Sequence, residues 1–173
     1  DFAAIRPFLE PIALKERAVL QEPRRRLEHI YFIEAGVVSL RALSTASYLE
    51  IAVVGYQGAV GISGLLGSDI PVHQSVVVFP GTALRIQVAE LRRLLGTHPQ
   101  ISKCLLRYVQ AFITQVTQSA LCGVRHQPEQ RLASWLCVLH DAHDSELLPV
   151  THDHIVSAHF TAQAARAAGR GVA

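Results

Sequence analysis

The first half of the chain alternates between short apolar runs and turns that contain glycine. Between residues 27 and 86 the turn signals recur about every 8 to 12 residues. Short runs at this spacing are typical of an antiparallel sheet that rolls or closes on itself. We therefore predict strands over 29–33, 37–43, 48–54, 76–79 and 83–88, with turns at Gly36 and at Pro80–Gly81.

The second half of the chain has the period of amphipathic helices. From Pro99 onward, apolar residues recur three and four positions apart through about six turns, which predicts one long helix over 97–123. One face of a sheet is able to cover such a stripe, but the same helix of a second copy covers it more economically. We therefore expect a dimer interface made of Ile101, Leu105, Tyr108, Phe112 and Val116.

The C-terminal region is expected to be helical only in part. Residues 129–140 have the pattern of another amphipathic helix, and Thr151 is a good N-cap for a further one. From residue 161 the chain consists largely of Ala, Arg and Gly, a composition with too little apolar bulk to form a core. The predicted class is α+β, with a β-roll over 1–96, a dimerisation helix over 97–123 and a partial helical domain over 124–173.

Composition narrows the class of protein. Half of the 173 residues are hydrophobic and only 17% are charged, so we expect a partner to cover some apolar surface. The formal charge of +2 does not by itself indicate a nucleic-acid partner. No apolar run approaches the roughly 20 residues of a membrane span, and no signal peptide is evident. Three widely spaced cysteines without a CxxC pair are typical of buried, reduced thiols in a cytoplasmic protein.

A glycine repeat follows the third predicted strand. Gly55, Gly58, Gly61, Gly64 and Gly67 recur every third residue. A turn of this kind is able to present backbone N–H groups to an anion. The alternative is that these glycines only allow tight turns with positive φ. The spacing leaves both interpretations open.

Candidate catalytic and metal-binding patterns are weak. Histidine and aspartate cluster over 140–144 and again over 152–154, at spacings that suit a metal. Both clusters lie at helix ends or in connectors, where these residues commonly cap helices, so we predict no metal and no cofactor. Residues 61–64 do not form a nucleophile elbow, and no base can be assigned to Ser63. We therefore expect a protein that is not an enzyme.

Several segments, taken in order, resemble one family. Residues 31–40, 58–61 and 80–86 are similar to the effector domain of Crp/Fnr-type transcriptional regulators, and 130–136 with 148–153 resemble the entry into their winged helix-turn-helix. The resemblance implies a cyclic-nucleotide-binding-like jelly roll, a dimerisation helix and a C-terminal DNA reader. It thus implies a homodimeric transcriptional regulator whose partner is duplex DNA.

The first departure from the family concerns the effector. Members that bind cyclic nucleotides hold a Glu for the ribose and an Arg for the phosphate, and this chain has Ile62 and Gln74 there, with Ser75 retained. Gln lacks the charge of Arg, and Ile accepts no hydrogen bond, so we expect no cyclic nucleotide and leave the effector unknown. The candidate effector-pocket residues are Gly61, Ile62, Ser63, Gly64, Gln74 and Ser75.

The second departure concerns the DNA reader. No recognition helix or wing follows the helix expected at Thr151, which suggests a truncated or frame-shifted ending. The remaining candidates for DNA contact are Thr151, His152, Arg166 and Arg170. Contacts from these residues to phosphates would not distinguish one DNA sequence from another. The alternative function is a dimerising regulatory or interaction module without DNA-binding activity of its own.

Overall fold

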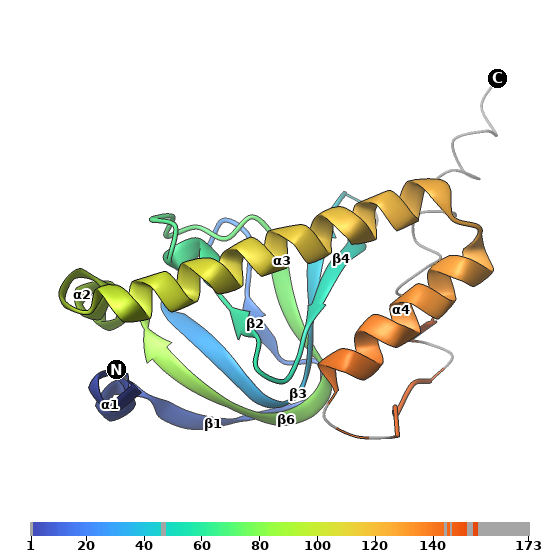
Figure 1. Ribbon diagram of the computed structural model, residues 1–173. Helices are drawn as coiled ribbons and strands as arrows, with labels where there is room; N and C mark the ends of the chain where they lie inside the picture. The colour runs from blue at the N-terminus through green and yellow to red at the C-terminus, as the bar shows by residue number, and fades with distance from the viewer. Residues whose placement is uncertain (1, 46–47, 144, 146, 152–153, 156–173) are drawn as a thin grey trace.

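The structure, a computed structural model, consists of a rolled antiparallel sheet with two long helices against it (Figure 1). It describes residues 2–45, 48–143, 145, 147–151 and 154–155. The elements are, in chain order, α1 (Phe2–Ile5), η1 (Arg6–Phe8), β1 (Glu10–Leu14), β2 (Val19–Gln21), β3 (His29–Leu43), β4 (Tyr48–Val54), β5 (Ala59–Val60), η2 (Ile62–Gly64), β6 (Gln74–Gln87), α2 (Val88–Thr97), α3 (Pro99–Arg125) and α4 (Pro128–Ala142).

The six strands form one antiparallel sheet in the order β1-β6-β3-β4. β2 also pairs with β6, and β5 pairs with β3. Side chains that alternate along the strands fill the inside of the roll, as the period of two requires. The inner cluster includes Ile33, Val38, Leu40, Val77 and Ala83. The predicted α+β class, an antiparallel roll followed by helices, is confirmed.

The predicted turns at Gly36 and at Pro80–Gly81 are wrong, because β3 and β6 each run through these positions as single strands. The two strands pair along most of their length, with register shifts around residues 33–38. Gly36 has a φ of +88°, and a Cβ there would lie 2.6 Å from the carbonyl oxygen of Phe79; a Cβ on Gly81 would overlap the carbonyl oxygen of Ala35. These glycines therefore let two paired backbones bend together.

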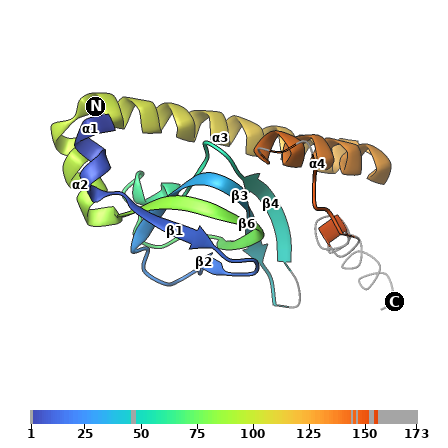
Figure 2. The ribbon, with the colours of Figure 1, turned by 90° about the horizontal axis from the view of Figure 1, so that it is seen from below.

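Helix α3 lies across the roll in both views (Figures 1 and 2). Its apolar stripe faces the chain's own sheet and α2, which corrects the expectation that a second copy covers it. Ile101 and Phe112 are 8% and 9% exposed within this one chain. Leu105 packs beside Ile101 in the cluster that includes α2, and Val116 packs beside Phe112 in the inner cluster. The sheet face that the periodicity left open as an alternative is the surface that covers the stripe.

The expectation of buried thiols is wrong as well. Cys104 and Cys137 are exposed and Cys122 is partly exposed. None of the described helices is long and apolar enough to cross a membrane.

Candidate functional site

Of the six candidate effector-pocket residues, Gly61 and Ser75 come together at the side chain of Gln21. Gly61 begins the turn with a φ of +101°, which a glycine adopts at little cost, and the short helix η2 follows it. The N–H groups of Gly64 and Leu65 bond to Gly61 and Ile62 carbonyls within the turn. Ser75, at the start of β6, is fully buried on the adjacent ladder. The Gly64 and Leu65 N–H groups are therefore already bonded within the turn and do not point toward an anion.

Gln21 fills the space between Gly61 and Ser75. Its side chain is 5% exposed, and its Oε1 accepts a hydrogen bond of 3.1 Å from the Ser75 hydroxyl. A Cβ on Gly61 would lie 2.7 Å from Gln21 Nε2, so the amide packs directly on the turn. Gln21 Nε2 is buried and makes no hydrogen bond with the described residues. The pattern of β2 gave no signal for this role, since a polar residue that ends a short strand usually faces water.

The carboxylate of Glu22 lies beside Gln74, the position at which the resemblance implies a phosphate-binding arginine in members that bind cyclic nucleotides. Gln74 donates a hydrogen bond of 3.0 Å from Nε2 to Glu22 Oε1. Gln21 thus pairs with Ser75 across the β2–β6 ladder, and Glu22, the residue after β2, pairs with Gln74. A negative charge at this place would repel a phosphate.

Arg92 of α2 holds the other side of the glycine turn, and the sequence analysis missed it. Its Nε donates to the Gly64 carbonyl oxygen at 3.0 Å, and its Nη1 lies 2.6 Å from Asp69 Oδ1. The second Asp69 oxygen lies 3.7 Å from Arg26. Asp69 thus already pairs with the guanidinium of Arg92, which acts here to join the turn to α2.

Tyr108 joins α3 to the same region of the roll. Its hydroxyl accepts a hydrogen bond of 2.8 Å from the Ala59 N–H and donates one of 3.1 Å to the Ala59 carbonyl. Burial raises the pKa of Tyr108, so the hydroxyl stays protonated and keeps both roles. Tyr108, expected at a dimer interface, therefore connects the long helix to β5, two residues before Gly61.

Helix α4 covers the outer face of the sheet, opposite the inner cluster. Leu139 is fully buried there against Val37, Val53 and Phe79. Trp135 donates from Nε1 to Glu50 Oε1 at 2.7 Å, and Ser39 donates to Glu50 Oε2 at 2.6 Å. Nothing in the sequence pattern indicated that α4 returns to the sheet, because partners so far apart along the chain leave no local signal.

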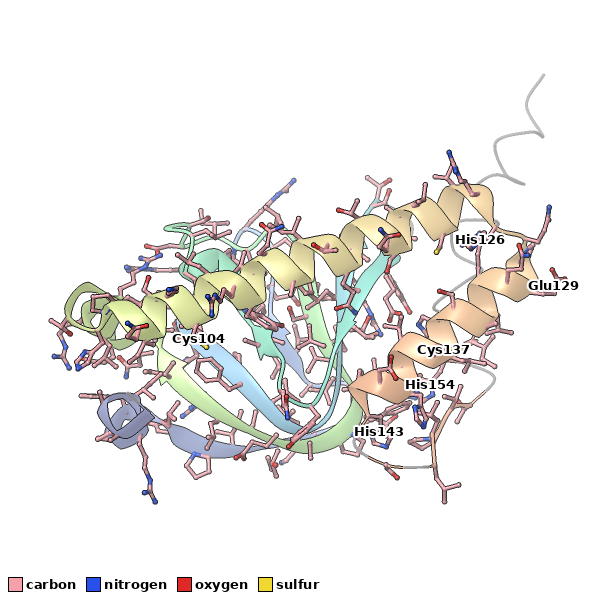
Figure 3. The ribbon with its side chains drawn as sticks, viewed as in Figure 1. Cys104, His126, Glu129, Cys137, His143 and His154 are labelled. Atoms are coloured by element: carbon pink, nitrogen blue, oxygen red, sulfur yellow. The ribbon has the colours of Figure 1, made fainter. Side chains whose placement is uncertain are left out.

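Only part of the predicted C-terminal site falls on described residues. Thr151 is exposed, and its Oγ1 accepts a hydrogen bond of 3.4 Å from the N–H of His154, as an N-cap does. His152, Arg166 and Arg170 lie outside the described residues. Among the described residues, no group of three or more His, Cys, Asp or Glu side chains is placed to hold a metal ion. His143 and His154 instead lie against the ring of Phe79, each with 5.4 Å between ring centroids (Figure 3).

Comparison with known proteins found similar structures but no significantly similar sequence. No family model matches this chain, and no curated protein is significantly similar to it. The chain is similar in structure to CLP, described as a c-di-GMP responsive global regulator of Xanthomonas campestris, with a TM-score of 0.75 and 17% identity over 98% of this chain and 91% of CLP.

Two further solved structures are similar over much of the chain. FixK2 from Bradyrhizobium japonicum has a TM-score of 0.76 and 11% identity, over 95% of this chain and 86% of FixK2. A cyclic nucleotide-binding domain from Methylobacillus flagellatus has a TM-score of 0.61 and 16% identity, over 73% of this chain and 76% of that domain.

These likenesses establish the fold. The chain has the cyclic-nucleotide-binding-like roll and helices of Crp/Fnr-type regulators, as the sequence resemblance predicted. CLP is described as a global regulator, and the Methylobacillus flagellatus protein as a cyclic nucleotide-binding domain. At identities of 11–17% the effector, the DNA site and the partner are not transferred from them.

Proposed function

We propose that this chain is the sensing and dimerising part of a transcription regulator of the Crp/Fnr type that acts as a homodimer. A second apolar stripe on α3, exposed in the single chain, is the observation that carries the proposal. Leu106 and Ile113 are 50% and 51% exposed, and Val124 is 84% exposed. Apolar side chains that remain this exposed along one helix face favour a protein partner.

The spacing of this second stripe is that of a coiled coil. Its members alternate four and three residues apart, and all six are exposed: Leu106, Gln110, Ile113, Thr117, Ala120 and Val124. We call these six residues the α3 seam. A heptad repeat with apolar residues at its a and d positions lets two helices pack together along their length. Gln110 and Thr117 are polar at two of these positions, and polar residues there fix register at some cost in stability.

A groove next to the seam favours the same partner. It has a volume of about 490 Å³ and is lined by Leu95, Pro99, Ser102, Lys103, Leu106, Arg107 and Gln110. Two of these residues belong to the seam, so a second α3 seated there would also cover the groove. The seam and the stripe on the sheet lie about a third of a turn apart on the helix, which lets α3 serve the roll and a partner together.

The proposed sensor does not use a cyclic nucleotide. Gln21 occupies the space behind Gly61, and Glu22 places a carboxylate beside Gln74. DNA contact would fall to the region after residue 124, where Thr151, His152, Arg166 and Arg170 stay the candidates. A regulator of this kind acts on cytoplasmic DNA, so the cytoplasm is the proposed location.

Disrupting the α3 seam tests the dimer. Ile113→Glu places a charge in the middle of the seam and should convert a dimer to a monomer in sedimentation equilibrium. Ala111→Glu adds the same charge at an exposed position on another face of α3 and should leave the dimer intact. A dimer that survives Ile113→Glu would place the interface elsewhere.

The same three proteins test the DNA partner. Titration with duplex DNA at rising salt should show binding whose logarithm falls linearly with the logarithm of the salt concentration. The wild type and Ala111→Glu should bind more tightly than Ile113→Glu, since two copies contact more phosphates. Absence of binding at low salt would favour the interaction module without DNA-binding activity.

A further inference from the structure

The contact between α4 and the outer face of the sheet has an apolar centre and a polar edge. The centre is Leu139 against Val37, Val53 and Phe79, four side chains that are each at most 5% exposed. In Figure 1, α4 leaves the far end of α3 and returns to the bend of β3 and β6. Each apolar pair that is removed from water here stabilises the docked position.

The polar edge is a chain of donors that ends on one carboxylate. Arg41 Nε donates to Ser39 Oγ at 3.1 Å, Ser39 donates to Glu50 at 2.6 Å, and Trp135 donates to the other Glu50 oxygen at 2.7 Å. Arg41 and Glu50 are also direct partners across the β3–β4 ladder. Glu50 is thus held by donors from both the sheet and α4, and it joins the two.

A backbone contact fixes the other end of α4. The Ala142 carbonyl, one of the last four of the helix, has no partner within the helix and accepts a hydrogen bond of 2.9 Å from the Tyr56 N–H. A Cβ on Gly55 would overlap this same carbonyl oxygen and would lie 2.6 Å from its carbon. The φ of Gly55 is not in the left-handed region. The fold therefore needs glycine at this position because α4 comes so close.

We propose that this contact is a releasable clasp, in which Glu50 and Gly55 set whether α4 is docked on the sheet. We define the clasp as Ser39, Arg41, Glu50, Gly55, Trp135, Leu139 and Ala142. Because α4 leads to the C-terminal region, the clasp couples the state of the roll to the position of that region. The coupling rests on the proposed function, whereas the clasp itself does not.

The contribution of the polar edge to docking is smaller than its number of hydrogen bonds suggests. Taking a carboxylate out of water costs free energy that its hydrogen bonds only partly offset, so the net contribution of Glu50 is small for its number of bonds. The connection from α3 to α4 is two residues long, and Gly123 in the last turns of α3 has no atom within 4 Å of a Cβ built on it. Both β3 and β4 carry clasp residues, so a displacement of either strand alters the contacts that hold α4.

The single tryptophan of the chain is a direct reporter of docking. Two variants disrupt the clasp in different ways. Glu50→Ala removes the hydrogen-bond acceptor, and Gly55→Ala adds a methyl group that overlaps the Ala142 carbonyl. We expect both to shift Trp135 emission to longer wavelength and to raise its quenching by acrylamide. Amide exchange within α4 should accelerate by about tenfold or more, while exchange in β3 and β6 stays slow.

Two matched controls separate release from general damage. Glu50→Gln keeps an acceptor for Trp135 and should keep the wild-type emission. Gly96→Ala makes the same change as Gly55→Ala at a helical position with nothing within 4 Å, and it should alter nothing. Unchanged emission and α4 exchange in both Glu50→Ala and Gly55→Ala would overturn the clasp, as would equal acceleration in the sheet. Both readouts report on α4 and need no DNA, and the dimer is measured separately by sedimentation, so the clasp and the proposed function fail separately.

Discussion

Glu50 is a carboxyl group that the fold takes from water at the junction of β3, β4 and α4. Burial raises its pKa above the ordinary 4.5, and the hydrogen bonds from Ser39 and Trp135 and the positive charges of Arg41 and His154 oppose that rise. A raised pKa means that the folded state holds the proton more tightly than the unfolded chain. The stability due to this proton is fully present below 4.5 and is lost as the pH rises through the raised pKa.

This linkage predicts a pH profile that belongs to one residue. As the pH rises from 4.5 through the raised pKa, the free energy of unfolding of the wild type should fall relative to that of Glu50→Gln, which carries no proton to lose. Urea unfolding of both proteins at a series of pH values, followed by Trp135 emission, measures the difference. Parallel profiles would show that Glu50 does not set the pH dependence, and a rising wild-type profile would reverse its sign.

At the scale of residues, only part of the candidate effector site could be predicted from the sequence. Gly61 and Ser75 were singled out from turn chemistry and from the family resemblance, and they do converge. Gln21 was not, because a buried glutamine gives no signal in a three-residue strand. What identifies it is its partner Ser75, which lies 54 residues away along the chain.

At the scale of elements, the bend shared by β3 and β6 gives a stability prediction. Gly81→Ala should destabilise the protein by roughly 2–4 kcal/mol, since the new Cβ overlaps the Ala35 carbonyl oxygen and both strands must move. Urea denaturation monitors the change, with Gly96→Ala as the control that should have little effect. A Gly81→Ala protein as stable as the wild type would mean that the strands part freely at the bend.

Local pattern predicted the elements better than their continuity. The strands over 48–54 and both long helices agree with the structure, because their periods arise from one face that meets the core. Glycine and Pro-Gly mark a hairpin turn and a bend in a paired strand equally well, so β3 and β6 were each divided in two. The apolar period of α3 was also read as one stripe, although two surfaces are served by that helix: the roll through Phe112, and the exposed seam through Ile113.

At the scale of the whole molecule, three surfaces of the helices have separate tasks. One stripe of α3 is bound to the roll, with Tyr108 as its polar anchor on β5. The α3 seam faces outward. Helix α4 sits on the outer face of the sheet through the clasp. Helix α3 carries two of these surfaces and is followed by α4, which carries the third. Because α3 is one continuous helix about 40 Å long, it connects the roll rigidly to the C-terminal region.

This separation predicts that dimerisation and docking are independent. The monomeric Ile113→Glu protein should keep the Trp135 emission and the slow α4 exchange of the wild type, because no clasp residue belongs to the α3 seam. Conversely, Gly55→Ala should release α4 and still sediment as a dimer. Trp135 fluorescence and sedimentation equilibrium on both variants and on the double variant provide the measurement. If the monomer loses docking, the partner's helix supports the clasp, and the sensor is complete only as a dimer. If the monomer keeps docking, each subunit sets the position of its own α4, and dimerisation serves only to bring two C-terminal regions together.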